Sequence, residues 1–90
     1  GGLDRMAAQA KGERVFLALL DQFTAEGRHV RHTTGDGYAP HAFAKSGRNE
    51  GVSKRELAAA MERLFARGAI RIAEHGPPSR RRKHIERTAE

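Results

Sequence analysis

The strongest structural signal in this chain is a helix start at Ser53-Lys54-Arg55-Glu56. In this capping box the serine oxygen accepts a hydrogen bond from the backbone N–H of Glu56, and the glutamate can return one to the serine N–H. An apolar stripe at helical spacing follows, made of Leu57, Met61, Leu64 and Phe65. Gly68 then favours a helix end. The pattern predicts an amphipathic helix with its stripe buried.

Two further helices are expected before this one. The first begins at Glu13 and ends at Glu26 before Gly27, and its apolar face consists of Val15, Phe16, Leu19, Leu20 and Phe23. A short second helix begins at Tyr38-Ala39-Pro40, since proline is well tolerated in a first helical turn. Residues 28–33 contain β-branched side chains and predict a short strand, and residues 46–51 form a polar turn.

A β-hairpin is expected after the third helix. Alternation over residues 69–75 predicts a half-buried strand with Ile70 and Ile72 facing inward. Residues 76–79 interrupt it, and the basic run that follows begins a return strand whose one large apolar residue is Ile85. The element order predicts an α+β fold, a winged helix-turn-helix with three helices and a C-terminal β-hairpin wing.

Ninety residues suffice for one domain. We expect the winged helix over residues 12–88 and a frayed end at residues 89–90. Residues 1–11 are interpreted either as a linker or as an extra helical turn that packs Met6, Ala7 and Ala10. The first residue is Gly1 rather than Met, so we expect a fragment of a longer protein.

The charge distribution bears on the class of partner. The net charge is +6, and residues 46–90 carry eleven Lys or Arg against six Asp or Glu, which gives +5 of that total. Such one-sided basic excess favours phosphate backbones as partners. The absence of cysteine excludes disulfides and cysteine-ligated zinc and suits a cytoplasmic protein. No apolar run approaches the length of a membrane span, so no membrane partner is expected.

The third helix and the wing supply the candidate DNA-binding residues. On the helix they are Ser53, Lys54, Arg55, Ala59 and Arg63. In the wing they are Ser79, Arg80, Arg81, Arg82 and Lys83. Arginines of a wing suit a minor groove or adjacent phosphates. The alternatives are a solvated helix face, a protein contact at Ala58-Ala59, and a free basic tail; Glu62 on the exposed face counts against DNA.

Catalytic and metal sites are not expected. Serines and threonines have no His or Asp partner at a recognisable spacing. Residues 35–37 lack the lysine and hydroxyl of a phosphate-binding loop. His29 and His32, three apart on a predicted strand, would point to opposite faces, and His41 lies further on, so all three are interpreted as surface residues. We therefore expect no enzyme activity, no cofactor, no metal and no small-molecule substrate.

Four segments together resemble the C-terminal module of RepA-like ATPases, the RecA-fold proteins of proteobacterial phages, plasmids and genomic islands. They are KGERVFLALLDQF (11–23), YAPHAF (38–43), VSKRELAAAMERLFARGAI (52–70) and HGPPSRRRKHI (75–85). The resemblance implies a winged-helix module that binds double-stranded DNA and is tethered to an ATPase domain of the same parent chain, in replication or mobile-element maintenance. It points to Lys54, Arg55 and residues 79–82. No Walker motif occurs in these residues.

Overall fold

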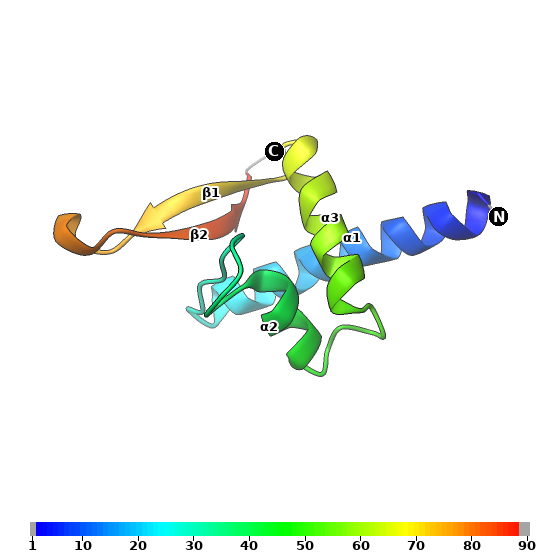
Figure 1. The fold of residues 1–90 in the computed structure, drawn as a ribbon, viewed down its shortest axis with the longest axis horizontal. Helices are drawn as coiled ribbons and strands as arrows, with labels where there is room; N and C mark the ends of the chain where they lie inside the picture. Colours follow the sequence, from blue (N-terminus) through cyan, green and yellow to red (C-terminus); the bar gives the residue numbers. More distant parts are fainter. Residues whose placement is uncertain (1, 89–90) are drawn as a thin grey trace.

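The computed structural model describes residues 2–88, which form three helices and a two-stranded antiparallel sheet (Figure 1). In chain order the elements are α1 (Gly2–Ala25), α2 (Ala39–Lys45), α3 (Lys54–Ala66), β1 (Ile70–His75), the 3-10 turn η1 (Pro78–Arg80) and β2 (Arg82–Arg87). A helix-turn-helix followed by a β-hairpin is the arrangement of a winged helix. The predicted α+β fold class is confirmed.

Apolar side chains from all three helices form the core. The ring of Phe43 on α2 meets Phe16 and Phe23 of α1 edge to face, at centroid distances of 4.9 and 5.0 Å. The buried stripe of α3 consists of Leu57, Ala60, Met61 and Leu64. Phe65, predicted as part of that stripe, is only half-buried. These contacts fix α3 against α1 and α2 and leave its opposite side to solvent.

The first helix is longer than predicted. It begins at Gly2 rather than Glu13 and continues through Gly12 without a break. Gly12 lies where α1 crosses α3, and a Cβ there would be 3.7 Å from that of Ala60. The predicted packing of Met6 is wrong, because Leu3 and Met6 are 84% and 66% exposed. Residues 2–8 instead project beyond the core as a helical overhang (Figure 1).

The predicted strand over residues 28–33 is not formed. Within residues 2–88 this segment makes one isolated bridge, between Arg31 and Tyr38. Hydrogen bonds within the loop replace those of a strand. The Arg31 N–H donates to the Gly37 carbonyl, and the Arg31 carbonyl accepts from the Ala39 N–H. The Val30 carbonyl still accepts from Ile85 N–H at 2.8 Å, so the loop lies against the edge of β2.

The wing is a regular hairpin whose root is packed on the helices. Ile72 pairs with Ile85, and Ile70 pairs with Arg87. Ile70 and Ile85 are buried, but Ile72 is 44% exposed, so only one of the two isoleucines predicted on β1 reaches the core. Thr88 N–H donates to the Ala69 carbonyl at 3.0 Å. The fraying predicted for residues 89–90 lies outside the described residues.

A transmembrane helix is not found in the described part of the chain, since none of its helices combines the necessary length and hydropathy.

Candidate nucleic-acid interface

The start of α3 presents two cations on a capped turn. Ser53 Oγ accepts from the backbone N–H of Glu56 at 3.1 Å, so this half of the predicted capping box is confirmed. Lys54 and Arg55 follow and are exposed. The ammonium of Lys54 lies 5.8 Å from the centre of the Tyr38 ring, within the range of a cation–π contact. The cap thus holds the first turn, and Tyr38 orients Lys54.

The wing tip is shaped by a glycine. Gly76 has φ +98°, and a Cβ at this position would lie 2.8 Å from the carbonyl oxygen of Arg80. Arg80 N–H closes the turn by donating to the Pro77 carbonyl at 2.8 Å. Ser79 and Arg80 are therefore presented at the end of the hairpin by a tight turn, and both are exposed.

A shallow basic hollow lies between the α1–α2 loop and the wing. It is lined by Arg31, His32, Thr33, Arg81, Arg82 and Lys83. Arg81 has an ion pair with Glu74 at 3.3 Å, in which both side chains are about half exposed. An ion pair this exposed contributes little free energy, so it can exchange for a phosphate. Four cations from two separate segments converge on the hollow.

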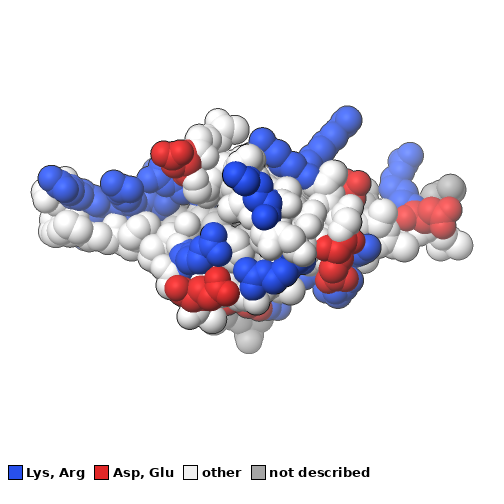
Figure 2. Space-filling model, turned by 90° about the horizontal axis from the view of Figure 1, so that it is seen from below, with Lys and Arg blue, Asp and Glu red and all other residues white. Residues whose placement is uncertain are grey.

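The loop that lines the hollow also contacts α3 and its neighbour Tyr38. Arg31 is bridged through its backbone to Tyr38, and Lys54 lies over the Tyr38 ring. His32, beside Arg31, meets Phe65 of α3 edge to face at 6.2 Å between ring centres. We call the following set the basic surface: Arg31, Lys54, Arg55, Arg80, Arg81, Arg82 and Lys83. Figure 2 shows Lys and Arg gathered along the wing end with few acidic residues among them.

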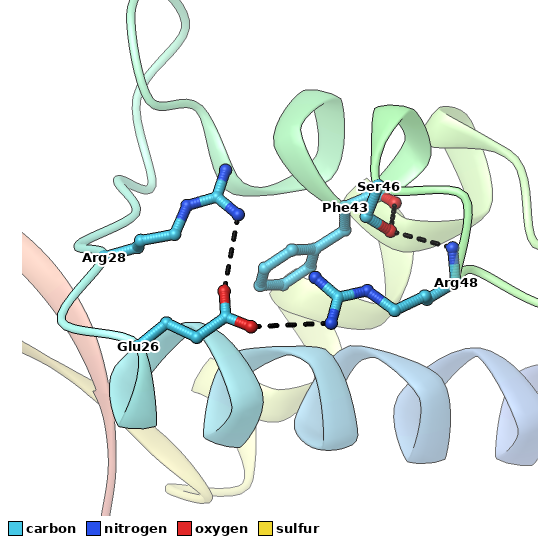
Figure 3. Close-up of polar contacts among 5 residues, drawn as sticks. All are labelled: Glu26, Arg28, Phe43, Ser46 and Arg48. Atoms are coloured by element: carbon cyan, nitrogen blue, oxygen red, sulfur yellow. Dashed lines mark hydrogen bonds and ion pairs between the residues drawn. The ribbon is translucent and has the colours of Figure 1, made fainter.

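Other cations are neutralised by carboxylates. Glu26 at the end of α1 pairs with both Arg28 and Arg48 at 3.5 Å (Figure 3). The Arg28 guanidinium also lies 4.1 Å from the centre of the Phe23 ring. The Ser46 hydroxyl donates a hydrogen bond to the Phe43 carbonyl, and its oxygen accepts one from the Arg48 N–H. These bonds fix the end of α2 beside the ion pairs of Glu26. These arginines hold the helices together and are not part of the basic surface.

Arg63, predicted as a DNA contact, is engaged inside the molecule. Its Nε donates to Glu13 at 2.9 Å and its Nη2 donates to the Gln9 carbonyl at 3.3 Å. Arg67 also pairs with Glu13, whose side chain is only 14% exposed. Arg63 therefore fastens α3 to α1, and we remove it from the candidate interface.

Two other residues of α3 border the interface without carrying positive charge. Ala59 is exposed, as predicted, but it lies near Ala8 and Gln9 on the side facing α1. Glu62 is exposed on the outer face of the helix. The predicted residues Ser53, Lys54 and Arg55 thus gather at the N-terminal end of α3, apart from Ala59.

Sequence reasoning missed Arg31 and a group of three histidines. Arg31 was not distinguishable from other loop cations, since its proximity to the wing depends on how the loop folds. His29, His75 and His84 meet where this loop touches the wing. The hairpin register places Ala73 opposite His84, so His75 is its diagonal neighbour on the same face. The signal in the sequence that could have paired the two strand histidines is the alternation of the predicted hairpin strands.

The histidines are close enough to affect one another. The Nδ1 atoms of His75 and His84 are 2.8 Å apart. Partial burial, followed by the charge of His29 and of His84, lowers the pKa of His75. Burial and then His29 lower the pKa of His84, while Glu86 acts in the opposite direction. Their surroundings therefore favour the neutral form of both imidazoles.

The comparisons with known proteins add no relative: no family model, no curated protein and no solved structure matches this chain.

Proposed function

We propose that this domain is a binding module for double-stranded DNA, not an enzyme, and that it contacts DNA mainly through phosphates. The observation that carries the proposal is the convergence of Arg31 with three wing cations on one hollow, together with two exposed cations on the capped first turn of α3. A helix-turn-helix with a wing presents such a surface to a groove and its two flanking backbones.

The charge balance of this surface supports a polyanion as the partner. Of its seven cations, one has an ion pair among the described residues. This is Arg81, which pairs with Glu74. Two acidic residues border the surface: Glu74, which pairs with Arg81, and Asp36, which lines a neighbouring hollow together with Arg31 and Arg82. Because the cations outnumber the carboxylates there, phosphate contacts release counterions and gain free energy.

The biological setting follows from the sequence resemblance and belongs to the proposal. A module of this kind tethered to an ATPase would bring the ATPase to DNA in replication or mobile-element maintenance. The location would then be cytoplasmic, in a bacterial cell where DNA is accessible. The experiments below test the isolated domain, and the proposal of a parent ATPase is tested by reading the open reading frame for a Walker motif upstream.

The direct test is fluorescence anisotropy of a labelled DNA duplex at several salt concentrations. With about five phosphate contacts, the plot of log affinity against log salt should have a slope of about −4 to −5. Duplexes of unrelated sequence should bind with similar affinity, because phosphate contacts carry no base information. A lack of binding at 50 mM salt, where electrostatic attraction is strongest, would refute the proposal.

A pair of charge-matched variants locates the interface. Arg82→Gln removes a cation of the basic surface and should weaken binding for all sequences and reduce the magnitude of the salt slope by about 1. Arg5→Gln removes the same charge from the first turn of α1, which Figure 1 places at the opposite end of the molecule from the wing. It should change affinity less than twofold. Equal effects of the two variants would mean that net charge, not this surface, drives binding.

A second candidate function is docking to a protein partner, such as the ATPase domain of the parent chain. The observation in its favour is the helical overhang of α1, on which Leu3 and Met6 are exposed. The two side chains lie one turn apart, and an apolar patch that extends over such a surface marks contacts with other proteins. This function is compatible with DNA binding, because the overhang and the wing lie at opposite ends of the molecule (Figure 1).

A further inference from the structure

Three of the five histidines of the chain meet where the α1–α2 loop touches the outer half of the wing, although they come from three separate segments. His29 comes from the α1–α2 loop, His75 from the end of β1 and His84 from β2. The His29 ring stacks on that of His75 at 4.0 Å between centres and lies 4.4 Å from that of His84. One ring nitrogen of each histidine lies within 4.8 Å of the others.

We propose that His29, His75 and His84 bind a divalent transition-metal ion, with zinc as the metal that the ligand set fits best. Three imidazoles and one open position form a known type of zinc coordination, in which Zn–N bonds are about 2.0–2.1 Å. Nitrogen ligands of a tetrahedral ion are then about 3.3 Å apart. This assignment is independent of the proposed DNA binding.

The rings need only small movements to reach that geometry. The Nδ1 atoms of His75 and His84 are 2.8 Å apart and would separate by about half an ångström around an ion. His29 would approach by at most about 1.5 Å from the largest separation in the group. Its side chain is exposed and lies in a loop, so one side of its ring faces solvent and leaves room for this movement.

The surroundings supply an orienting carboxylate. His84 Nε2 lies 3.8 Å from a carboxylate oxygen of Glu86, while its Nδ1 faces His75. A metal-binding histidine usually donates its other ring N–H to a carboxylate or carbonyl, which fixes the tautomer and strengthens the ligand. Glu86 is 3.8 Å away, so a small rotation of its side chain would bring it within hydrogen-bond distance for this role. Asp36 lines the hollow beside His29 and His75 and offers an oxygen for the open position.

Cations next to the cluster determine which metal ions it can bind. Arg31, Arg82 and Lys83 line the same hollow and repel a divalent ion. Hard ions such as Mg²⁺ and Ca²⁺ depend on several anionic oxygens, which this site lacks within the described residues. Zinc bonds strongly to neutral imidazole nitrogen, so it tolerates these neighbours better. The site is therefore selective for nitrogen-seeking metals.

A bound ion would connect segments that now touch through few contacts. The loop reaches the wing through the Val30–Ile85 hydrogen bond and the stacked histidines. Coordination would join the loop and both strands at one point. Because the site is assembled only in the folded chain, the ion stabilises the native state in proportion to its free concentration.

The test uses the whole chain without a polyhistidine tag, freed of metal with EDTA and then exchanged into chelator-free buffer. Zinc chloride is titrated by isothermal calorimetry, and thermal unfolding is followed with and without zinc. We expect one ion per chain and a rise of about 10 °C in the unfolding midpoint at a hundredfold excess over Kd. Failure to bind zinc at about 100 µM would overturn the proposal.

Single substitutions distinguish this site from adventitious binding. His29→Gln and His84→Gln should each lower zinc affinity at least tenfold, since a ligand is lost. His41→Gln, an exposed histidine of α2, is the matched control and should leave affinity unchanged. Equal losses in all three variants, or none in His29→Gln, would overturn the assignment. Circular dichroism of each zinc-free variant confirms that it is folded before affinity is compared.

Discussion

Lys54 and Arg63 are cations on the same helix, but their partners give them different roles. Arg63 is held by Glu13 and by the Gln9 carbonyl, so moving it to a phosphate would break two hydrogen bonds that join the helices. Lys54 has only the face of Tyr38 beside it, a contact that leaves the ammonium accessible. Sequence spacing predicted that both side chains lie near an exposed face of α3. Their roles differ because Glu13 of α1 binds Arg63.

Glu62 allows a residue-scale test of whether the outer face of α3 approaches DNA. It is exposed on that face, where a carboxylate near phosphates is repelled. Glu62→Gln should therefore tighten duplex binding about two- to fivefold at 50 mM salt, and less at higher salt. Anisotropy titrations at two salt concentrations measure this.

The control for that substitution is Glu50→Gln, which changes net charge equally. Glu50 lies before α3 and pairs with Arg14 of α1 at 3.3 Å. It should alter affinity less than Glu62→Gln does. Identical affinities of wild type and Glu62→Gln would show that the wing binds DNA without α3 and would favour a protein contact for this helix.

At the scale of elements, sequence patterns were reliable where local chemistry decides the structure. The Ser53 cap, the buried Leu57, Met61 and Leu64 of α3, and the hairpin with Ile85 inward were all predicted from local patterns. The predicted start of the first helix at Glu13 was wrong, because glycine stops a helix only when nothing favours its continuation. Here Gly12 allows α1 to approach Ala60 closely, and that contact is not visible in a local pattern.

The wing provides the element-scale prediction. In Gly76→Ala the new Cβ would meet the Arg80 carbonyl oxygen at 2.8 Å, and φ +98° is unfavourable for alanine, so the tip has to rearrange. Displaced arginines should weaken DNA binding several-fold while the helices stay folded. Circular dichroism, urea unfolding and anisotropy together measure these effects.

Gly47→Ala isolates the effect of the clash from that of backbone strain. Gly47 has φ +76° in the turn after α2, with no atom within 4 Å of an added Cβ. It should cost about 1 kcal/mol of stability and leave DNA affinity unchanged. If Gly76→Ala binds DNA as tightly as Gly47→Ala, the geometry of the wing tip is not important for binding.

At the scale of the whole molecule, the features that the sequence did not reveal are contacts between distant segments. Arg31 joins the basic surface, and His29 joins His75 and His84, because the α1–α2 loop lies against the edge of β2 through Val30. No pattern within residues 28–38 encodes that position. The order of elements was predictable because each has its own start and end signals, whereas sites built between elements depend on packing.

Deletion of the helical overhang of α1 shows whether it stabilises the fold or is available to a partner. Deleting residues 1–8 removes exposed Leu3 and Met6 but keeps Gln9, whose carbonyl binds Arg63. The deletion removes one acidic and one basic side chain, Asp4 and Arg5, so net charge and DNA affinity should not change. Because the described core begins at Gly12, the unfolding midpoint should fall by no more than about 3 °C. Thermal unfolding and anisotropy provide the measurements.

A larger loss of stability would mean that the overhang is part of the fold, and would remove the reason to assign it to a partner.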